Sequence, residues 1–344
     1  MKKIINKENV FILAEVAQSY EGNIDVLVDT SEKTCQAGAD GIMFQVVFAD
    51  ELAVKDYVHY NLFKSLEMPQ KNWQRVIQSI QHKKKLAFGE VFGKRSVDMM
   101  MNLGIDALKI HASDLSNLPF LKYVGTLKVP VLLSVGGGYD AEIKTAIRVL
   151  EDGGVEELIL MHGYQACPTD IRDTHLAKMQ ALQNIYGLPV GYSDHIAGCH
   201  DGNVKHLNEL ALYLPLVAIG AGAKVIEKHI MRDRAKAWED HESALIPEEF
   251  STFVKLIRAL ESSLGEKNTK FYAPETAYRQ NAKKYLVAAH KIQKGTKLKE
   301  GMVAFKRIAN PSTGLTNLEE AVGKIAAWDL DTDDPIQSSG LTDQ

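Results

Sequence analysis

Two strand-like segments that each end in histidine decide the fold: LPVGYSDH at residues 188–195 and AKVIEKH at residues 223–229. Both begin with apolar residues and end with charged or hydroxyl side chains. If these segments are strands of one parallel barrel, their carboxyl ends meet at the same rim. His195 and His229 would then face one point, which is how barrel enzymes hold a divalent metal ion.

The alternation of strand and helix continues along most of the chain. Eight short, β-branched runs are predicted as strands: Val10–Val16, Gly41–Val47, Leu86–Phe92, Ala107–His111, Val129–Val135, Glu157–His162, Leu188–Tyr192 and Ala223–His229. Helical patterns separate them: Asp25–Ala37, Lys71–Lys83, Ser96–Leu103, Ala141–Glu151, Thr174–Tyr186 and Asn208–Ala221. Eight such units in roughly 250 residues are typical of a (β/α)8 TIM barrel. An open doubly wound sheet normally has G-x-G-x-x-G after its first strand, but here QSYEG follows at residues 18–22.

Three regions are expected. Residues 1–265 form the barrel, residues 266–283 are polar and aperiodic and read as a linker, and residues 284–344 form a small β-rich domain. Inside the barrel region, the polar stretch Ala197–Glu209 is long for a loop and is interpreted as a lid or an oligomer contact.

Composition excludes several classes of protein. The chain has 344 residues, 45% of them apolar, and a net charge of −4, so nucleic acid is not expected as a partner. No apolar run reaches the roughly 18 residues that span a membrane. The polar N-terminus does not resemble a signal peptide, and three cysteines without a C-x-x-C pair fit a reducing cytoplasm.

The predicted strand ends are dense in ionisable and hydroxyl side chains. A lysine there, Lys109, is costly to bury unless it meets an anion, and Ser134 with the glycines at 136–138 suits a phosphate or carboxylate. Two neutral imidazoles suit a divalent metal such as Mn²⁺, Fe²⁺ or Zn²⁺. Carboxylates are available to position a polyol or move protons: Glu15, Glu227 and Asp240.

Purely structural explanations stay open for these residues. They are a Lys109–Asp114 ion pair, His195 as a buried hydrogen-bonding residue, a Glu227–Lys228 ion pair, Asp240 and His241 as caps of the last helix, and Gly136–Gly138 as a tight turn only.

Several motifs together resemble the sialic acid synthase family, which makes nonulosonic acids. They are AEV at 14–16 with Gly22, KIHASD at 109–114, LSVG at 133–136, the two histidine segments, and DH at 240–241 followed by LIPEEF at 245–250. Residues 284–344 resemble the family's C-terminal antifreeze-like (SAF) domain, so the resemblance covers nearly the whole chain.

The resemblance implies a metal-dependent condensation of phosphoenolpyruvate with an N-acyl hexosamine. It assigns the metal, Mn²⁺ first with Mg²⁺, Co²⁺, Fe²⁺ and Zn²⁺ as alternatives, to His195 and His229. Substrate binding falls to Lys109, Ser134, Gln165, Ser193 and Arg307, and catalysis to Glu15, Asp114, Glu227 and Asp240. It also implies a domain-swapped homodimer in which Arg307 reaches the neighbour's site.

The chain departs from the family's pattern around the phosphoenolpyruvate pocket. Met43 stands where the family usually has a lysine, and further departures are Ser19-Tyr20, Ala112, Gln165 and Cys167. One hypothesis is that Lys94 or Arg95 supplies the missing charge. Two other functions therefore stay open: a Schiff-base pyruvate aldolase using Lys109, and a non-catalytic sugar-binding homologue.

Overall fold

The computed structural model describes residues 3–5, 9–164, 166, 168–198, 209–235 and 239–343. They form two compact units that divide between residues 265 and 266. Each unit is described by itself below.

The first unit is a closed barrel of eight parallel strands, as predicted. The strands are β1 Phe11–Glu15, β2 Gly41–Val46, β3 Leu86–Val91, β4 Ala107–Ile110, β5 Val131–Ser134, β6 Leu158–His162, β7 Val190–Asp194 and β8 Val225–His229. Each strand pairs with the next along the chain, and β8 pairs with β1 to close the ring. All eight lie inside the predicted segments or extend them by two residues at most.

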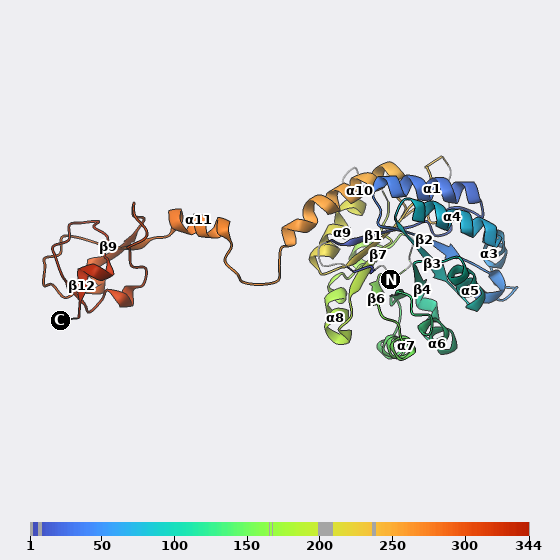
Figure 1. The fold of residues 1–344 in the computed structure, drawn as a ribbon, viewed down its shortest axis with the longest axis horizontal. Coiled ribbons are helices and arrows are strands. Elements are labelled where there is room, and N and C mark those ends of the chain that lie inside the picture. The colour runs from blue at the N-terminus through green and yellow to red at the C-terminus, as the bar shows by residue number, and fades with distance from the viewer. Residues whose placement is uncertain are drawn as a thin grey trace. The chain divides into compact units, whose positions relative to one another are not determined.

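Helices surround this barrel on its outside (Figure 1). They are α1 Ile24–Ala37, α2 Ala49–Leu52, α3 Tyr60–Leu66, α4 Gln70–His82, α5 Lys94–Asn102, α6 Leu118–Gly125, α7 Asp140–Gly153, α8 Ala177–Tyr186, α9 Leu210–Gly220 and α10 Pro247–Leu260. Local chemistry sets their ends. Asn23 caps α1, because its side chain accepts hydrogen bonds from the N–H groups of Asp25 and Val26, and Gly38 ends the helix in the left-handed conformation.

The barrel interior is divided into an apolar layer and a polar layer, because alternate strand residues point inward. The apolar layer lies toward the strand starts and contains Ile4, Phe11, Leu13, Met43, Leu86, Phe88, Ala107, Leu132, Ile159, Met161 and Val225. The backbone N–H groups of Ile4 and Ile5 donate to the carboxylate of Glu157 over 3.0 and 2.8 Å, which anchors the N-terminal segment at this end. The carboxyl ends of the strands carry the polar layer.

The second unit has its own small core. Two antiparallel strand pairs, β9 Tyr285–Ala288 with β10 Val303–Lys306 and β11 Ile325–Ala326 with β12 Leu341–Thr342, frame buried aliphatic residues. The core residues are Leu286, Ala288, Ile292, Leu298, Leu315, Ala321, Ala326, Leu330 and Ile336. The segment predicted as a linker, residues 266–283, contains a helix, α11 Ala273–Ala282, none of whose residues is buried.

Most of the predicted lid segment Ala197–Glu209, including His200 and His206, lies outside the described residues. Within the part of the chain that the structure describes, no helix combines the length and the apolar character that a bilayer crossing requires.

Candidate active site

Lys109 lies at the centre of the polar layer, between two carboxylates. Its Nζ is 2.7 Å from Oε1 of Glu227 and 3.3 Å from Oε1 of Glu90, and at most 2% of each of the three side chains is exposed. The strand register brings Glu90 and Lys109 together, because they are paired positions of β3 and β4. Glu227 comes from β8. The ion pair that the sequence offered between Lys109 and Asp114 is therefore replaced by contacts with other strands.

Burial and neighbouring charges alter the acidity of this cluster. Burial alone would lower the pKa of Lys109, but Glu227, Glu90 and Glu15 raise it above its usual value, so the side chain stays an ammonium. Burial raises the pKa of Glu227, and raises that of Glu15 well above its usual range. The Glu15 carboxylate accepts a hydrogen bond from Ala17 N over 2.7 Å, and its Oε2 has no partner. A buried carboxyl of this kind can hold a proton near neutral pH.

Two histidines and a carboxylate converge beside this cluster. His195 follows β7, while Glu227 and His229 lie on β8, and one ligand atom from each falls within 4.8 Å of the others. All three side chains are buried. The ring centroids of His195 and His229 are 4.9 Å apart. The predicted convergence of His195 and His229 is thus present in the structure.

The donor atoms of these three residues suit a divalent metal ion. Nε2 of His195, both ring nitrogens of His229 and Oε2 of Glu227 are buried and have no hydrogen-bond partner. Such orphaned polar atoms are costly unless a ligand satisfies them. Burial lowers the pKa of His195 to about 3 and that of His229 well below its usual value, so both imidazoles are neutral and able to coordinate. Nitrogen and carboxylate donors fit Mn²⁺, Fe²⁺ or Zn²⁺.

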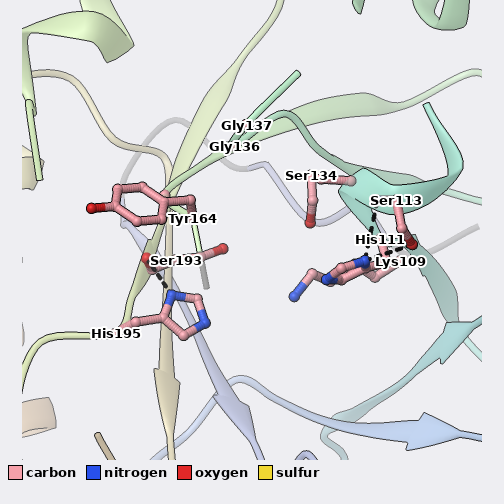
Figure 2. Close-up of a pocket in the computed structure, with 11 residues that line it drawn as sticks. Lys109, His111, Ser113, Ser134, Gly136, Gly137, Tyr164, Ser193 and His195 are labelled. Atoms are coloured by element: carbon pink, nitrogen blue, oxygen red, sulfur yellow. Dashed lines mark hydrogen bonds between the residues drawn. The ribbon is translucent and has the colours of Figure 1, made fainter. Parts of the chain in front are cut away.

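A cavity of about 390 Å³ opens over this layer. Figure 2 shows Lys109, His111 and Ser134 on one side of it and Tyr164, Ser193 and His195 on the other. The remaining lining residues are Ala112, Ser113, Gly136, Gly137 and Gly163. Hydroxyl groups, an ammonium and one candidate metal ligand, His195, therefore face one space. Within the described residues, Lys109 is the only lysine or arginine in its lining.

The glycine turn after β5 is required by close packing. A Cβ atom on Gly136 would lie 1.9 Å from the backbone oxygen of Gly163, and Gly137 has a φ of +78°. The absence of side chains lets the loops after β5 and β6 touch at the cavity wall.

A second cavity of about 520 Å³ adjoins the first and shares His111 and Ser113 with it. Aromatic and aliphatic side chains line much of it: Leu52, Ala53, Val54, Tyr57, Phe63 and Phe92. Gln18 and Gln45 add a polar edge and are joined by a hydrogen bond of 3.0 Å.

An ion pair behind the histidines holds β7 and β8 together. Lys228 Nζ is 3.0 Å from Asp194 Oδ2, and neither side chain is exposed. Lys228 therefore pairs with Asp194 and not with Glu227, its neighbour in sequence. The other oxygen of Asp194 accepts from Ile196 N over 3.1 Å, so this carboxylate also fixes the backbone that follows His195.

The other predicted site residues occupy different surroundings. Asp114 is half-buried in a short 3-10 helix, where burial raises its pKa and Asn117 donates to it. Burial raises the pKa of Asp240 to about 6. Asp240 caps no helix, because α10 begins at Pro247 after Ile246. Arg307 is exposed in the second unit. Gln165 and Cys167 lie outside the described residues.

Lys94 and Arg95, the residues suggested as sources of the missing positive charge, contact aromatic rings. Lys94 Nζ lies 4.9 Å from the ring centre of Tyr123, and the Arg95 guanidinium lies 3.8 Å from that of Phe48. Neither lines the two cavities. Met43, which replaces that lysine, belongs to the apolar layer.

One central residue was not singled out from the sequence. Glu90 does not stand out in the sequence among the other polar residues near strand ends, yet it contacts Lys109 inside the barrel. The available signal was its place at the end of β3, in register with Gln45 and Lys109.

Comparison with known proteins agrees with this geometry. The model of the NeuB family matches residues 30–269, and that of the SAF domain matches residues 283–342. An uncharacterised protein of Methanocaldococcus jannaschii is 31% identical over 300 residues, which cover 87% of this chain and 85% of that protein. The N,N'-diacetyllegionaminic acid synthase of Campylobacter jejuni is 29% identical over 349 residues, covering 96% of this chain and 99% of the synthase.

A solved structure shares the fold. The N-acetylneuraminic acid (sialic acid) synthetase of Leptospira borgpetersenii superposes with a TM-score of 0.72 at 27% identity, over 80% of this chain and 92% of that one. The resemblance inferred from the motifs is confirmed, and the chain belongs to the NeuB family.

Proposed function

We propose that the protein is a metal-dependent synthase that condenses phosphoenolpyruvate with an N-acyl hexosamine and water, giving a nonulosonic acid and phosphate. The observation that carries this proposal is the buried donor set of His195, Glu227 and His229 beside a cavity lined by hydroxyl groups and an ammonium. The relatives named as synthases of legionaminic, pseudaminic and N-acetylneuraminic-9-phosphate products support this reaction class.

The reaction joins C3 of phosphoenolpyruvate to the aldehyde carbon of the open-chain sugar. Water adds its oxygen to C2 and gives up a proton, and the C2–O bond to phosphate then breaks. His195, Glu227 and His229 would hold a divalent ion, Mn²⁺ as first choice, which would supply Lewis-acid polarisation of the aldehyde oxygen. Every other task falls to side chains and backbone groups of the chain.

Neutral hydrogen-bond donors would hold the donor substrate. Ser134 and Ser193 offer hydroxyls, and the turn at Gly136–Gly137 offers backbone N–H groups to a carboxylate or phosphate. Lys109 adds a positive charge at the base of the same cavity. Gln165 is expected to contribute from the loop after β6.

Carboxyl groups would handle protons and the sugar hydroxyls. Glu15 has a raised pKa and an unpartnered oxygen, so it can take or return a proton during water addition. We assign Asp114 and Asp240 to the acceptor, since burial raises the pKa of both and each can shift between donor and acceptor of a hydrogen bond. The neighbouring cavity with its aromatic wall provides room for the acyl group.

The environment of Lys109 argues against the Schiff-base alternative. Imine formation requires a neutral amine, whereas the three surrounding carboxyl groups raise the pKa of Lys109 and keep it protonated. Borohydride with pyruvate is expected to leave the protein unlabelled. A covalent adduct on Lys109 would instead support the aldolase.

The proposal is tested by phosphate release. Metal-free protein receives phosphoenolpyruvate and a panel of N-acylated hexosamines, with and without Mn²⁺, and phosphate is measured. Release that depends on both sugar and metal, and that stops with chelator, is expected. With the bridging oxygen of phosphoenolpyruvate labelled by ¹⁸O, the label should leave in phosphate. No release with any sugar, together with sugar binding, would favour the non-catalytic homologue.

We also propose a domain-swapped homodimer in the cytoplasm, in which Arg307 completes the neighbour's site. A mixture of two inactive variants, Arg307→Ala and His195→Gln, tests this. After random subunit exchange half of the dimers are heterodimers, and each contains one site with both residues intact. Up to a quarter of all sites should therefore become active, whereas a monomeric protein recovers no activity. Light scattering gives the oligomeric state independently.

A further inference from the structure

Among the described residues, Glu90 is a charged group inside the barrel whose carboxylate has no hydrogen bond. It is fully buried, and neither carboxylate oxygen has a hydrogen-bond partner among the described residues. Its ion pair is with Lys109, at 3.3 Å. The same ammonium lies closer to Glu227, at 2.7 Å, and donates its hydrogen bond there. Glu90 therefore shares a cation that another carboxylate already holds.

The polar layer consequently carries an excess of negative charge. Glu90 and Glu227 together bring two carboxylates to one ammonium, so these contacts leave one carboxylate without a cation of its own. The other buried lysine nearby, Lys228, is paired with Asp194 and does not offset it. Met43, on the neighbouring strand β2, is apolar and adds no positive charge.

The carboxylate of Glu90 lies close to the metal-donor residues. It is 3.3 Å from Nζ of Lys109, and that Nζ is 2.7 Å from Glu227, one of the three metal-donor residues. Charges interact strongly over such distances where water is excluded. A negative charge placed here attracts a cation to the three metal-donor residues and repels an anion from the adjoining cavity.

We propose that Glu90 is a specificity-determining residue that makes the site bind its divalent cation before its anionic donor. Without the cation, the leftover negative charge opposes phosphoenolpyruvate. Once the cation is bound, the layer is no longer negative, and the serines and the glycine turn can hold the donor. This inference rests on the proposed function only for the identity of the two ligands.

The test measures binding of each ligand alone to metal-free protein. Mn²⁺ affinity is measured by calorimetry, and phosphoenolpyruvate affinity by equilibrium dialysis without metal. In Glu90→Gln, which keeps the shape and removes the charge, Mn²⁺ is expected to bind about tenfold more weakly and phosphoenolpyruvate about tenfold more tightly. The wild type should bind phosphoenolpyruvate at least about fivefold more tightly with Mn²⁺ present, and Glu90→Gln should lose most of this coupling.

Opposite shifts distinguish an electrostatic role from a structural one. If Glu90 served only to pack against Lys109, its replacement would disturb the site and weaken both ligands. Glu90→Asp keeps the charge while shortening the side chain, so it should bind both ligands much as the wild type does. Glu151→Gln removes one carboxylate from the exposed outer face of α7 and should change neither affinity.

Any result other than opposite shifts overturns the proposal, including unchanged or jointly weakened binding. Glu90→Ser is also neutral and must give the same pattern, which keeps the test decisive if Glu90→Gln does not fold. Since both measurements are equilibria without turnover, opposite shifts in a protein that releases no phosphate would reject the proposed reaction while supporting the role of Glu90.

Discussion

Asp194 and Lys228 form a fully buried ion pair across β7 and β8, with Oδ2 and Nζ 3.0 Å apart. The pair lies on the barrel's outer side, because each residue is adjacent in sequence to one that points inward: Ser193 or Glu227. It therefore supports the two strands that carry the metal-donor histidines without entering the cavity.

Removing one partner of this pair is expected to be costly. Asp194→Asn or Lys228→Met leaves a buried charge unpaired and should lower the free energy of unfolding by about 3–5 kcal/mol. The double variant Asp194→Asn/Lys228→Met should cost clearly less than the sum of the single changes. Urea titration measures all four proteins. Additive losses would show that the two side chains do not depend on one another.

The histidine site is expected to account for specific metal binding. His195→Gln or His229→Gln should weaken Mn²⁺ binding about a hundredfold or more, since even partners outside the coordination sphere matter at the 10–100-fold level. The control is His162→Gln, a buried histidine whose Nε2 bonds to Thr174 O over 2.8 Å, away from the cluster. Equal losses in all three variants, measured by calorimetry, would contradict the assignment.

Acid should destabilise the metal-free protein through the same two histidines. Unfolded histidine takes a proton below about pH 6.5. In the folded protein burial lowers the pKa of His195 to about 3 and that of His229 well below its usual value. The unfolded state thus binds more protons, and each histidine lowers the free energy of unfolding by about 1.4 kcal/mol per pH unit as the pH falls below about 6.5.

This pH dependence is measured by urea titration between pH 7 and pH 4 in the presence of chelator. The stability contributed by neutral histidines is complete above their unfolded pKa and is lost progressively toward the folded values. The variant His195→Gln/His229→Gln should show a shallower decline than the wild type. Parallel curves for the two proteins would mean that the histidines accept protons while folded.

The contact between the loops after β5 and β6 predicts a sharp difference between two glycines. Gly136→Ala places a Cβ atom 1.9 Å from the Gly163 oxygen and should cost about 3 kcal/mol or more, while also weakening phosphoenolpyruvate binding. Gly220 is the last residue of α9, and a Cβ atom added there would have no atom within 4 Å. Gly220→Ala should therefore leave the stability unchanged or raise it slightly. Thermal unfolding compares them, and similar melting temperatures would refute the packing argument.

The sequence predicts the barrel well because each parallel strand is a separate apolar run. It also places His195 and His229 at one rim, since both end such runs and the ends of parallel strands converge. The partners of Lys109 could not be found in the same way. Asp114 is close in sequence, but Glu227 is 118 positions away and reaches Lys109 only because the barrel closes.

Alternation within a strand explains another difference between sequence and structure. Glu227 and Lys228 are neighbours of opposite charge, yet successive strand residues point to opposite faces, so each finds its partner on another strand. Helix α11 was not predicted for a separate reason. It buries no residue, so its sequence has no apolar stripe of helical period. Its remaining signals were local, a proline at Pro274 and a Glu275 carboxylate accepting from Tyr272 N.

The apolar layer beneath the polar residues closes the barrel at the strand starts. Met43, Phe88 and Leu132 belong to this floor, and the anchored N-terminal segment lies against it. Among the described residues, the cavities open on the strand-end side, so substrates and products share that side of the barrel. Under the proposed reaction, a product that stays bound there blocks the next substrate, so product inhibition follows from the way the barrel is filled.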